Sequence, residues 1–208
     1  MTQDQKALIA IDFDHTIFNT TIFVEALRER LVRDFKIDRE MFMKQRQRIK
    51  DCCLVIDIDN FISALPHNDK KALHEAIIDV ISNHASEFIF DDVLPFFEDH
   101  KDAFDILIIT HGDKELQTNK IENSNLPDFV KHKISVDQKD NVLGEFVDKY
   151  DEIHFIDDKA ANIDLVKLAH PDIVTYFIVR HEDNPYADDV PECASADYTI
   201  EDLEFTIE

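Results

Sequence analysis

Two aspartates, Asp12 and Asp14, follow the apolar run Ala7–Ile11 at a spacing of two residues. An apolar run without alternation is typical of a strand that is buried on both faces. Like charges held this close raise each other's proton affinity unless a positive charge lies between them. The pair therefore predicts a cation, a bound phosphate or both at the end of the first strand.

Three further polar groups each follow an apolar run later in the chain, where a buried strand would end. They are Thr110 with His111 and Gly112, then Lys139, then Asp157 with Asp158 and Asn162. Ligands of open α/β sheets bind outside the carboxyl ends of the strands. We therefore expect these groups to lie beside Asp12 and Asp14.

These residue types match the chemistry of a phosphate monoester. The Asp12 carboxylate can attack phosphorus and form an aspartyl-phosphate, while Asp14 protonates the leaving oxygen and later deprotonates the attacking water. Thr110 and the backbone N–H groups after it can hold phosphoryl oxygens, and Lys139 can neutralise phosphoryl charge. Asp158 would complete the ligands of a Mg²⁺ ion that bridges Asp12 and the phosphate.

Strands and helices that could position these groups alternate in the second half of the chain. The five predicted strands are Ala7–Ile11, Ile106–Ile109, Lys133–Val136, Ile153–Ile156 and Ile173–Val179. Amphipathic patterns over Asp140–Tyr150 and Ala160–His170 predict helices between the later strands. This alternation predicts an α/β fold with a three-layer, Rossmann-like parallel sheet.

The long gap between the first two strands, residues 20–87, contains no convincing strand. Apolar stripes at helical spacing begin at Phe23 and Leu73, and breaks fall near Ile37–Asp38 and at Leu65–Pro66. We predict three or four helices there, inserted where ligands bind such sheets. The predicted domains are an α/β core over 1–18 plus 88–208 and a helical cap over 19–87.

In this order, the four polar groups resemble the motifs of the haloacid dehalogenase superfamily of phosphohydrolases. Those motifs are an apolar strand ending in Asp-x-Asp-x-Thr, a strand ending in Thr or Ser, a Lys, and a strand ending in an acidic pair or Gly-Asp. The matching residues are Asp12, Asp14, Thr16, Thr110, Lys139, Asp157 and Asp158. The resemblance covers the predicted core but not the insertion, which in the family is a substrate-selecting cap.

The resemblance implies a role for each matching residue. Asp12 would be the nucleophile and a ligand of Mg²⁺, Asp14 the acid/base with its backbone carbonyl on the metal, and Asp158 a further metal ligand. Around them we expect residues that hold the catalytic groups in place and residues that contact the phosphate. The supporting residues are Thr16, Asp157 and Asn162, and the phosphate-side residues are Thr110, His111, Gly112 and Lys139.

Two positions depart from the common pattern of the family. Asp157 stands where many members have Gly, which leaves open whether Asp157 or Asp158 contacts the metal. We prefer Asp158 and expect Asn162 either to support it or to cap the following helix.

The second departure is His15, which stands where Gly is frequent. For His111 we favour a structural role over substrate contact. Members with dehalogenase activity lack the second aspartate, so Asp14 favours phosphoryl chemistry.

The chain carries 45 acidic residues against 22 lysines and arginines, a formal net charge of −23. Nucleic acids and anionic membranes are therefore not expected as partners. A small phosphorylated metabolite is compatible, because a local site can be positive in an acidic protein. Residues 28–50 hold nine basic and four acidic residues, and we interpret them as a solvated helical face rather than a substrate-recruiting site.

The three cysteines do not form a disulfide framework, and no spacing matches a zinc site. The chain starts with polar residues, and its first apolar run is far too short for a signal peptide or a membrane span. We therefore expect a reduced, cytoplasmic protein.

The leading hypothesis is a Mg²⁺-dependent phosphatase of a small phosphorylated metabolite. A nucleotidase or a phosphotransferase would use the same core residues. A phospho-acceptor receiver domain would carry its acidic pair on the first strand and its acceptor on the third, which contradicts the order here. A non-catalytic protein that binds a phosphate ligand would be favoured by loss of the catalytic residues, but they are all present.

Overall fold

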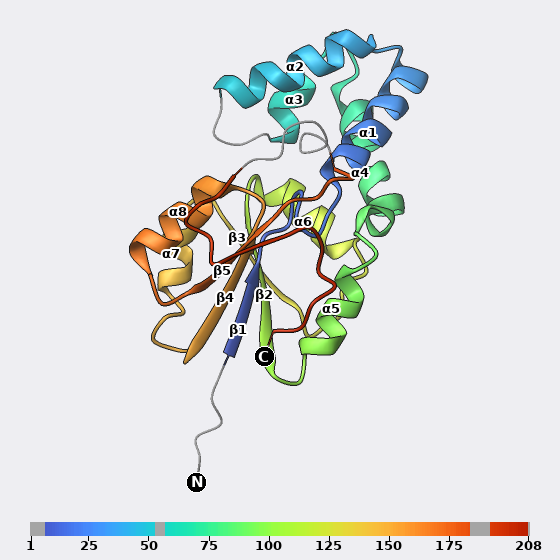
Figure 1. The fold of residues 1–208 in the computed structure, drawn as a ribbon. Coiled ribbons are helices and arrows are strands. Elements are labelled where there is room, and N and C mark those ends of the chain that lie inside the picture. Colours follow the sequence, from blue (N-terminus) through green and yellow to red (C-terminus); the bar gives the residue numbers. More distant parts are fainter. Residues whose placement is uncertain (1–6, 53–56, 184–191, 208) are drawn as a thin grey trace. The chain divides into compact units, whose positions relative to one another are not determined.

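The computed structural model describes residues 7–52, 57–183 and 192–207, which form two compact units (Figure 1). One unit holds the described residues up to Asn19, Ile89–His111 and those from Leu126 onward. The other holds the described residues of Thr20–Phe88 together with Gly112–Asn125. The helical unit thus includes a segment, 112–125, that follows the second strand and lies outside the predicted insertion.

A six-stranded parallel sheet forms the centre of the first unit. Its strands are β1 (Ala7–Ile11), β2 (Phe104–His111), β3 (Lys131–Ser135), β4 (Glu152–Asp157), β5 (Val174–Ile178) and β6 (Tyr198–Ile200). Their order across the sheet is β3-β2-β1-β4-β5-β6, so the winding reverses between β1 and β4. The predicted Rossmann-like fold is confirmed, and the reversal marks the crevice where ligands of such sheets bind.

Helices cover the two faces of this sheet (Figure 1). On one face, α7 (Lys139–Gly144) and α8 (Ala160–Ala169) pack on alternate strand residues such as Ala10 and Phe155, which are fully buried. On the other face, α5 (Val93–His100) contributes an aromatic cluster, in which His100 packs against Phe104. Burial on both faces explains why β1, β2, β4 and β5 read as largely apolar runs. The strand predicted as buried over 133–136 is instead the edge strand β3, which has no buried residue and ends at Ser135.

Two further local predictions differ from the structure. The helix expected over 140–150 ends at Gly144, because the N–H groups of Glu145 and Phe146 bond carbonyls three residues back, at 3.3 and 2.8 Å. Such tight bonds replace the α-helical pattern at a glycine, a poor helix former. The edge strand β6 was missed, since three residues make too short a run to predict.

The other unit consists of helices. They are α1 (Thr20–Phe35), α2 (Arg39–Cys52), α3 (Ile58–Ala64), α4 (Lys70–His84), the 3₁₀ turn η1 (Ala85–Phe88) and α6 (Lys114–Glu122). The predicted breaks fall between α1 and α2 and between α3 and α4. Both predicted stripes are buried, the first including Phe23 and the second Leu73. Asp69 and Asp113 cap α4 and α6 by accepting a backbone N–H at 2.9 Å.

Candidate active site

A buried lysine lies between two carboxylates at the carboxyl edge of the sheet. Lys139, the first residue of α7, donates from Nζ to Asp12 Oδ1 and, at 2.6 Å, to Asp157 Oδ2. The three residues are at most 4% exposed. Asp12 follows β1, and its N–H donates to the carbonyl of Ile156 on β4 at 2.9 Å. The positive charge that the Asp12 region requires is therefore supplied by the chain itself.

Burial and charge act in opposite directions on this group. Burial lowers the pKa of Lys139, but the charges of Asp12 and Asp157 outweigh it and hold that pKa above its usual value. Burial raises the pKa of Asp157 and outweighs the opposing attraction of Lys139. The ammonium of Lys139 therefore stays charged at neutral pH, a fixed positive charge beside the Asp12 carboxylate.

Three buried carboxylates lie close enough to hold one metal ion. Asp12, Asp157 and Asp158 each offer an oxygen within 4.8 Å of the others. Hard oxygen donors of this kind suit Mg²⁺, so the residues fit the metal that the sequence motifs imply. A cation here would offset the mutual repulsion of the three acids.

Hydrogen bonds engage both oxygens of Asp157. Asp157 Oδ1 accepts from the N–H of Lys159 at 2.8 Å, and Asn162 Nδ2 donates to both Asp157 oxygens at 3.0 Å. With Lys139 on Oδ2, each oxygen of Asp157 has two donors. Asp157 is thus engaged in holding Lys139. Asn162 thus supports Asp157, while its support of Asp158 stays a prediction.

The residues after Asp12 form a tight turn. The N–H of His15 donates to the carbonyl of Phe18 at 2.9 Å, and the N–H of Phe18 donates to the carbonyl of Phe13 at 2.9 Å. Asp14 is half-buried in this turn and Thr16 is fully buried. His15 has a φ of 63°, in the left-handed region that favours glycine. This backbone explains why glycine is frequent at that position in the family that the motifs resemble.

Thr110 is buried near the end of β2, at the same edge of the sheet as Asp12. His111 is the last residue of β2 and is exposed. Gly112 belongs to the helical unit, where an added Cβ would come within 3.0 Å of the Gln117 side chain. The sheet therefore gathers Thr110 with Asp12, Lys139, Asp157 and Asp158 at one edge.

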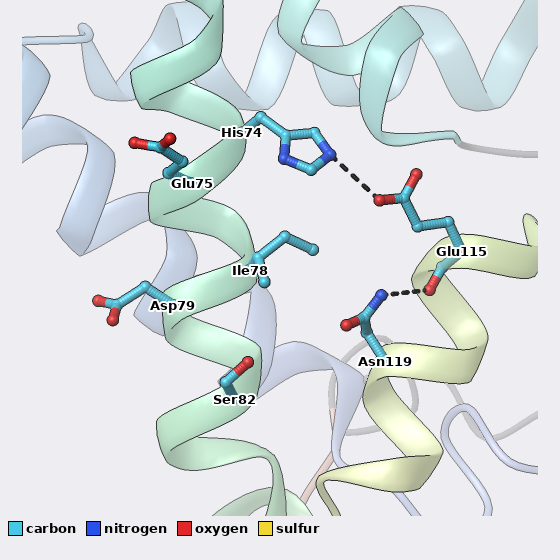
Figure 2. A pocket seen from close by; sticks show the side chains of 7 residues that line it. All are labelled: His74, Glu75, Ile78, Asp79, Ser82, Glu115 and Asn119. Atoms are coloured by element: carbon cyan, nitrogen blue, oxygen red, sulfur yellow. Dashed lines mark hydrogen bonds and ion pairs between the residues drawn. The ribbon is translucent and has the colours of Figure 1, made fainter.

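The helical unit has an open groove of about 460 Å³ between α4 and α6 (Figure 2). Its lining residues are His74, Glu75, Ile78, Asp79, Ser82, Glu115 and Asn119. His74 Nε2 lies 3.3 Å from Glu115 Oε1 across the groove. None of the predicted site residues lines it, and its three acids make it unsuited to a phosphate.

Within the described ranges, no helix is long and apolar enough to span a membrane. No protein-family model and no curated protein matches the sequence.

Solved structures match over nearly the whole chain. A protein assigned as a haloacid dehalogenase-like hydrolase from Burkholderia xenovorans LB400 has 18% identity over 98% of this chain and 100% of its own, with a TM-score of 0.78. The HAD-hydrolase YfnB of Bacillus subtilis, solved bound to magnesium, has 17% identity over 97% and 96%, with a TM-score of 0.67. The defluorinating L-2-haloacid dehalogenase Rha0230 has 13% identity over 96% and 92%, with a TM-score of 0.67.

These likenesses define the class of fold. The chain has the fold of the haloacid dehalogenase-like hydrolases, as the four sequence motifs predicted. At identities below 20% the likeness concerns the fold alone, and its examples include a dehalogenase. The reaction must therefore be argued from the residues of the site.

Proposed function

We propose that the protein is a Mg²⁺-dependent phosphohydrolase that removes phosphate from a small phosphorylated metabolite through an aspartyl-phosphate on Asp12. The observation that carries the proposal is the buried Lys139 between Asp12 and Asp157, with Asp158 alongside, at the reversal point of the sheet. A phosphate dianion needs fixed positive charge where it reacts, and this site has it.

The chain's own residues divide the reaction into two displacements. An Asp12 oxygen attacks phosphorus, the bond from phosphorus to the substrate oxygen breaks, and Asp14 gives that oxygen a proton. Asp14 then takes a proton from a water that attacks the same phosphorus, and the bond from phosphorus to Asp12 breaks to release phosphate. Lys139 holds Asp12 in place and offsets negative charge, and Asp157 holds Lys139.

Mg²⁺ would be held by Asp12, Asp158 and the backbone carbonyl of Asp14, while Asp157 is engaged elsewhere, because each of its oxygens already accepts from two donors. When bound, the ion supplies positive charge that neutralises the phosphoryl group. YfnB, which shares the fold, was solved with magnesium, and this supports the choice of metal.

The helical unit is proposed to act as the cap that selects the substrate. Its helices Thr20–Phe35 to Lys70–His84 are inserted directly after the turn that carries Asp14. A cap at this position favours a small metabolite over a phosphoprotein. We also propose that the protein acts in the reducing cytoplasm, in keeping with its three cysteines.

Dehalogenation is the main competing reaction on this fold, since Rha0230 is a dehalogenase. Asp14 argues against it here, because dehalogenases of the superfamily that the motifs resemble lack the second aspartate. A non-catalytic phosphate-binding protein has less support, because Asp12, Lys139 and Asp158 are all retained.

The test is phosphate release from p-nitrophenyl phosphate and a panel of phosphorylated metabolites, with Mg²⁺ or EDTA. We expect release that needs Mg²⁺ and that Asp12→Asn lowers by at least about a thousandfold, because the nucleophile is lost. Asp172→Asn is the matched control: Asp172 is exposed on the turn before β5, so its loss should leave the rate unchanged.

The same samples are assayed for halide release from L-2-chloropropionate. Halide release without phosphate release would replace the proposal by dehalogenation. Binding of inorganic phosphate with neither reaction would favour a non-catalytic binding protein.

A further inference from the structure

The turn that carries Asp14 is strained at His15, whose φ of 63° disfavours any residue with a Cβ. The turn spans Phe13 to Phe18, and three backbone hydrogen bonds of 2.9 to 3.1 Å close it. A strained backbone persists only where surrounding contacts hold it. The contacts on His15 therefore bear on where Asp14 lies.

A hydrogen bond to a buried acid holds the His15 ring. His15 Nδ1 donates to Asp183 Oδ2 at 2.8 Å, across 168 positions of sequence. Asp183 is completely buried, and a buried carboxylate is costly unless it is paired. Loss of this contact would leave the Asp183 carboxylate buried with a partner fewer, which favours the bound position of the imidazole. Because the ring is fixed, the backbone of His15 is restrained in its strained conformation.

Arg180 contacts the same turn at Thr16, the residue after His15. Its Nε donates to the carbonyl of Thr16 at 3.0 Å. The guanidinium is itself fixed, because it donates to both oxygens of Asp92 at 2.5 and 3.0 Å and lies 4.2 Å from the centre of the Phe90 ring. Arg180 is 1% exposed, so this arrangement is well excluded from water.

We infer that the segment after β5 is a positioning element, in which Asp183 acts through His15, and Arg180 through Thr16, to fix the turn that aims Asp14. The inference rests on the proposed function for the role of Asp14. It also explains how a histidine is tolerated at a glycine position: the hydrogen bond to Asp183 offsets the unfavourable backbone. His15, Arg180 and Asp183 touch no reacting atom in this scheme and are positioning residues.

The first readout is hydrogen exchange, which needs no activity. We compare Asp183→Asn, which removes the charge, with His15→Gly, which removes the ring but suits the left-handed backbone. In both variants the turn amides of His15, Ile17 and Phe18 should exchange at least about tenfold faster, while those of β1 change less than about twofold. The matched control is Asp197→Asn, which removes an acid that pairs with Lys167 near the start of β5 at 2.8 Å.

The second readout separates acid catalysis from general loss of structure. A good leaving group such as p-nitrophenolate needs little protonation, whereas the alkoxide of glycerol 2-phosphate needs a well-placed acid. In Asp183→Asn and His15→Gly, kcat/KM for glycerol 2-phosphate should therefore fall at least about tenfold more than kcat/KM for p-nitrophenyl phosphate. Asp197→Asn should leave the ratio unchanged.

The inference would be overturned if exchange accelerated equally in the turn and in β1 and the ratio of kcat/KM values for the two esters stayed unchanged. The contact between His15 and Asp183 would then stabilise the whole fold rather than the turn. Selective exchange in a protein whose wild type hydrolyses no phosphate ester would refute the proposed function while supporting the fixing of the turn. Unchanged turn exchange in Asp183→Asn would show that the Asp183 carboxylate does not fix the turn, which also overturns the inference.

Discussion

The carboxyl edge of the sheet and the first two helices of the other unit use charged residues in opposite ways. At the sheet edge, Lys139 is buried and pairs with Asp12, which is 127 positions away in sequence. In α1, Arg30 is a third exposed and pairs with Asp34, one helical turn away, at 2.6 Å. Burying the first pair costs desolvation free energy, and the pair holds two distant segments in one specific geometry. The second pair stays solvated, so it costs little free energy and contributes little to stability.

The comparison also bears on the arginines in the first part of the basic stretch 28–50. Its arginines at 28, 30, 33 and 39 each pair with an acid within ten positions, namely Glu25, Asp34 or Glu29, and Arg30 also pairs with the exposed Asp79. A local excess of positive charge in the sequence therefore does not by itself mark an anion site. Burial and long-range pairing are better guides, and they point to the sheet edge.

The largest effect on stability should come from the buried pair of Arg180 and Asp92. Arg180→Met should lower the free energy of unfolding by about 3–5 kcal/mol, because Asp92 is left largely buried without its cation. Urea denaturation measures the loss. The double variant Arg180→Met/Asp92→Leu should recover much of it, since the uncompensated charge is gone. If Arg180→Met lowered the free energy of unfolding by less than about 1 kcal/mol, the buried pair would contribute no more than an exposed pair such as Arg30 with Asp34.

A smaller effect should appear in the pH dependence of stability. Burial lowers the pKa of His154, against the raising effect of Glu152. An unfolded histidine has a pKa of about 6.5. Between that value and the lower folded value, the unfolded chain binds more protons, so the free energy of unfolding falls as the pH falls. The fall ends below the folded pKa and amounts to about 1.4 kcal/mol for each unit of lowering.

His154→Gln should remove this component and flatten the dependence between about pH 7.5 and about pH 5, while other groups act equally in both proteins. Glutamine can still bond the Tyr176 hydroxyl, which lies 3.1 Å from His154 Nδ1. Urea denaturation across that range measures the difference. Parallel curves for the two proteins would contradict the burial argument.

The smallest effect should come from the exposed pairs. Arg30→Gln should cost less than about 1 kcal/mol, although the side chain contacts both Asp34 and Asp79. The effect should shrink further at high salt, because exposed charges are screened. A loss above about 2 kcal/mol that salt does not change would mean that the two regions do not differ in the way described.

The sheet and the gathering of Asp12, Lys139 and Asp157 at its carboxyl edge could be predicted because their signals are local. Asp12 and Asp157 each close an apolar run, and a strand buried on both faces leaves that mark in any sequence. The short strand β6 left too little pattern, and the early end of α7 depended on tight bonds after Gly144.

The contacts around the turn could not be predicted, because they join residues with no local relation. Nothing near His15 indicates Asp183, and nothing near Asp92 indicates Arg180. Two buried charges late in an acidic segment look like solvated surface until the fold brings partners to them. The one available sign was a histidine at a position where glycine is frequent.

The central place of β1 in the sheet has a consequence for how the protein is made. Ala7 pairs with Phe104 on one side and with Glu152 on the other, so the first strand to be synthesised must wait for most of the chain before it has neighbours. Pairings this distant fold slowly, and an apolar strand left waiting is prone to aggregate. Asp12 can meet Lys139 and Asp157 only after all three segments have been synthesised, so this cluster forms late in folding.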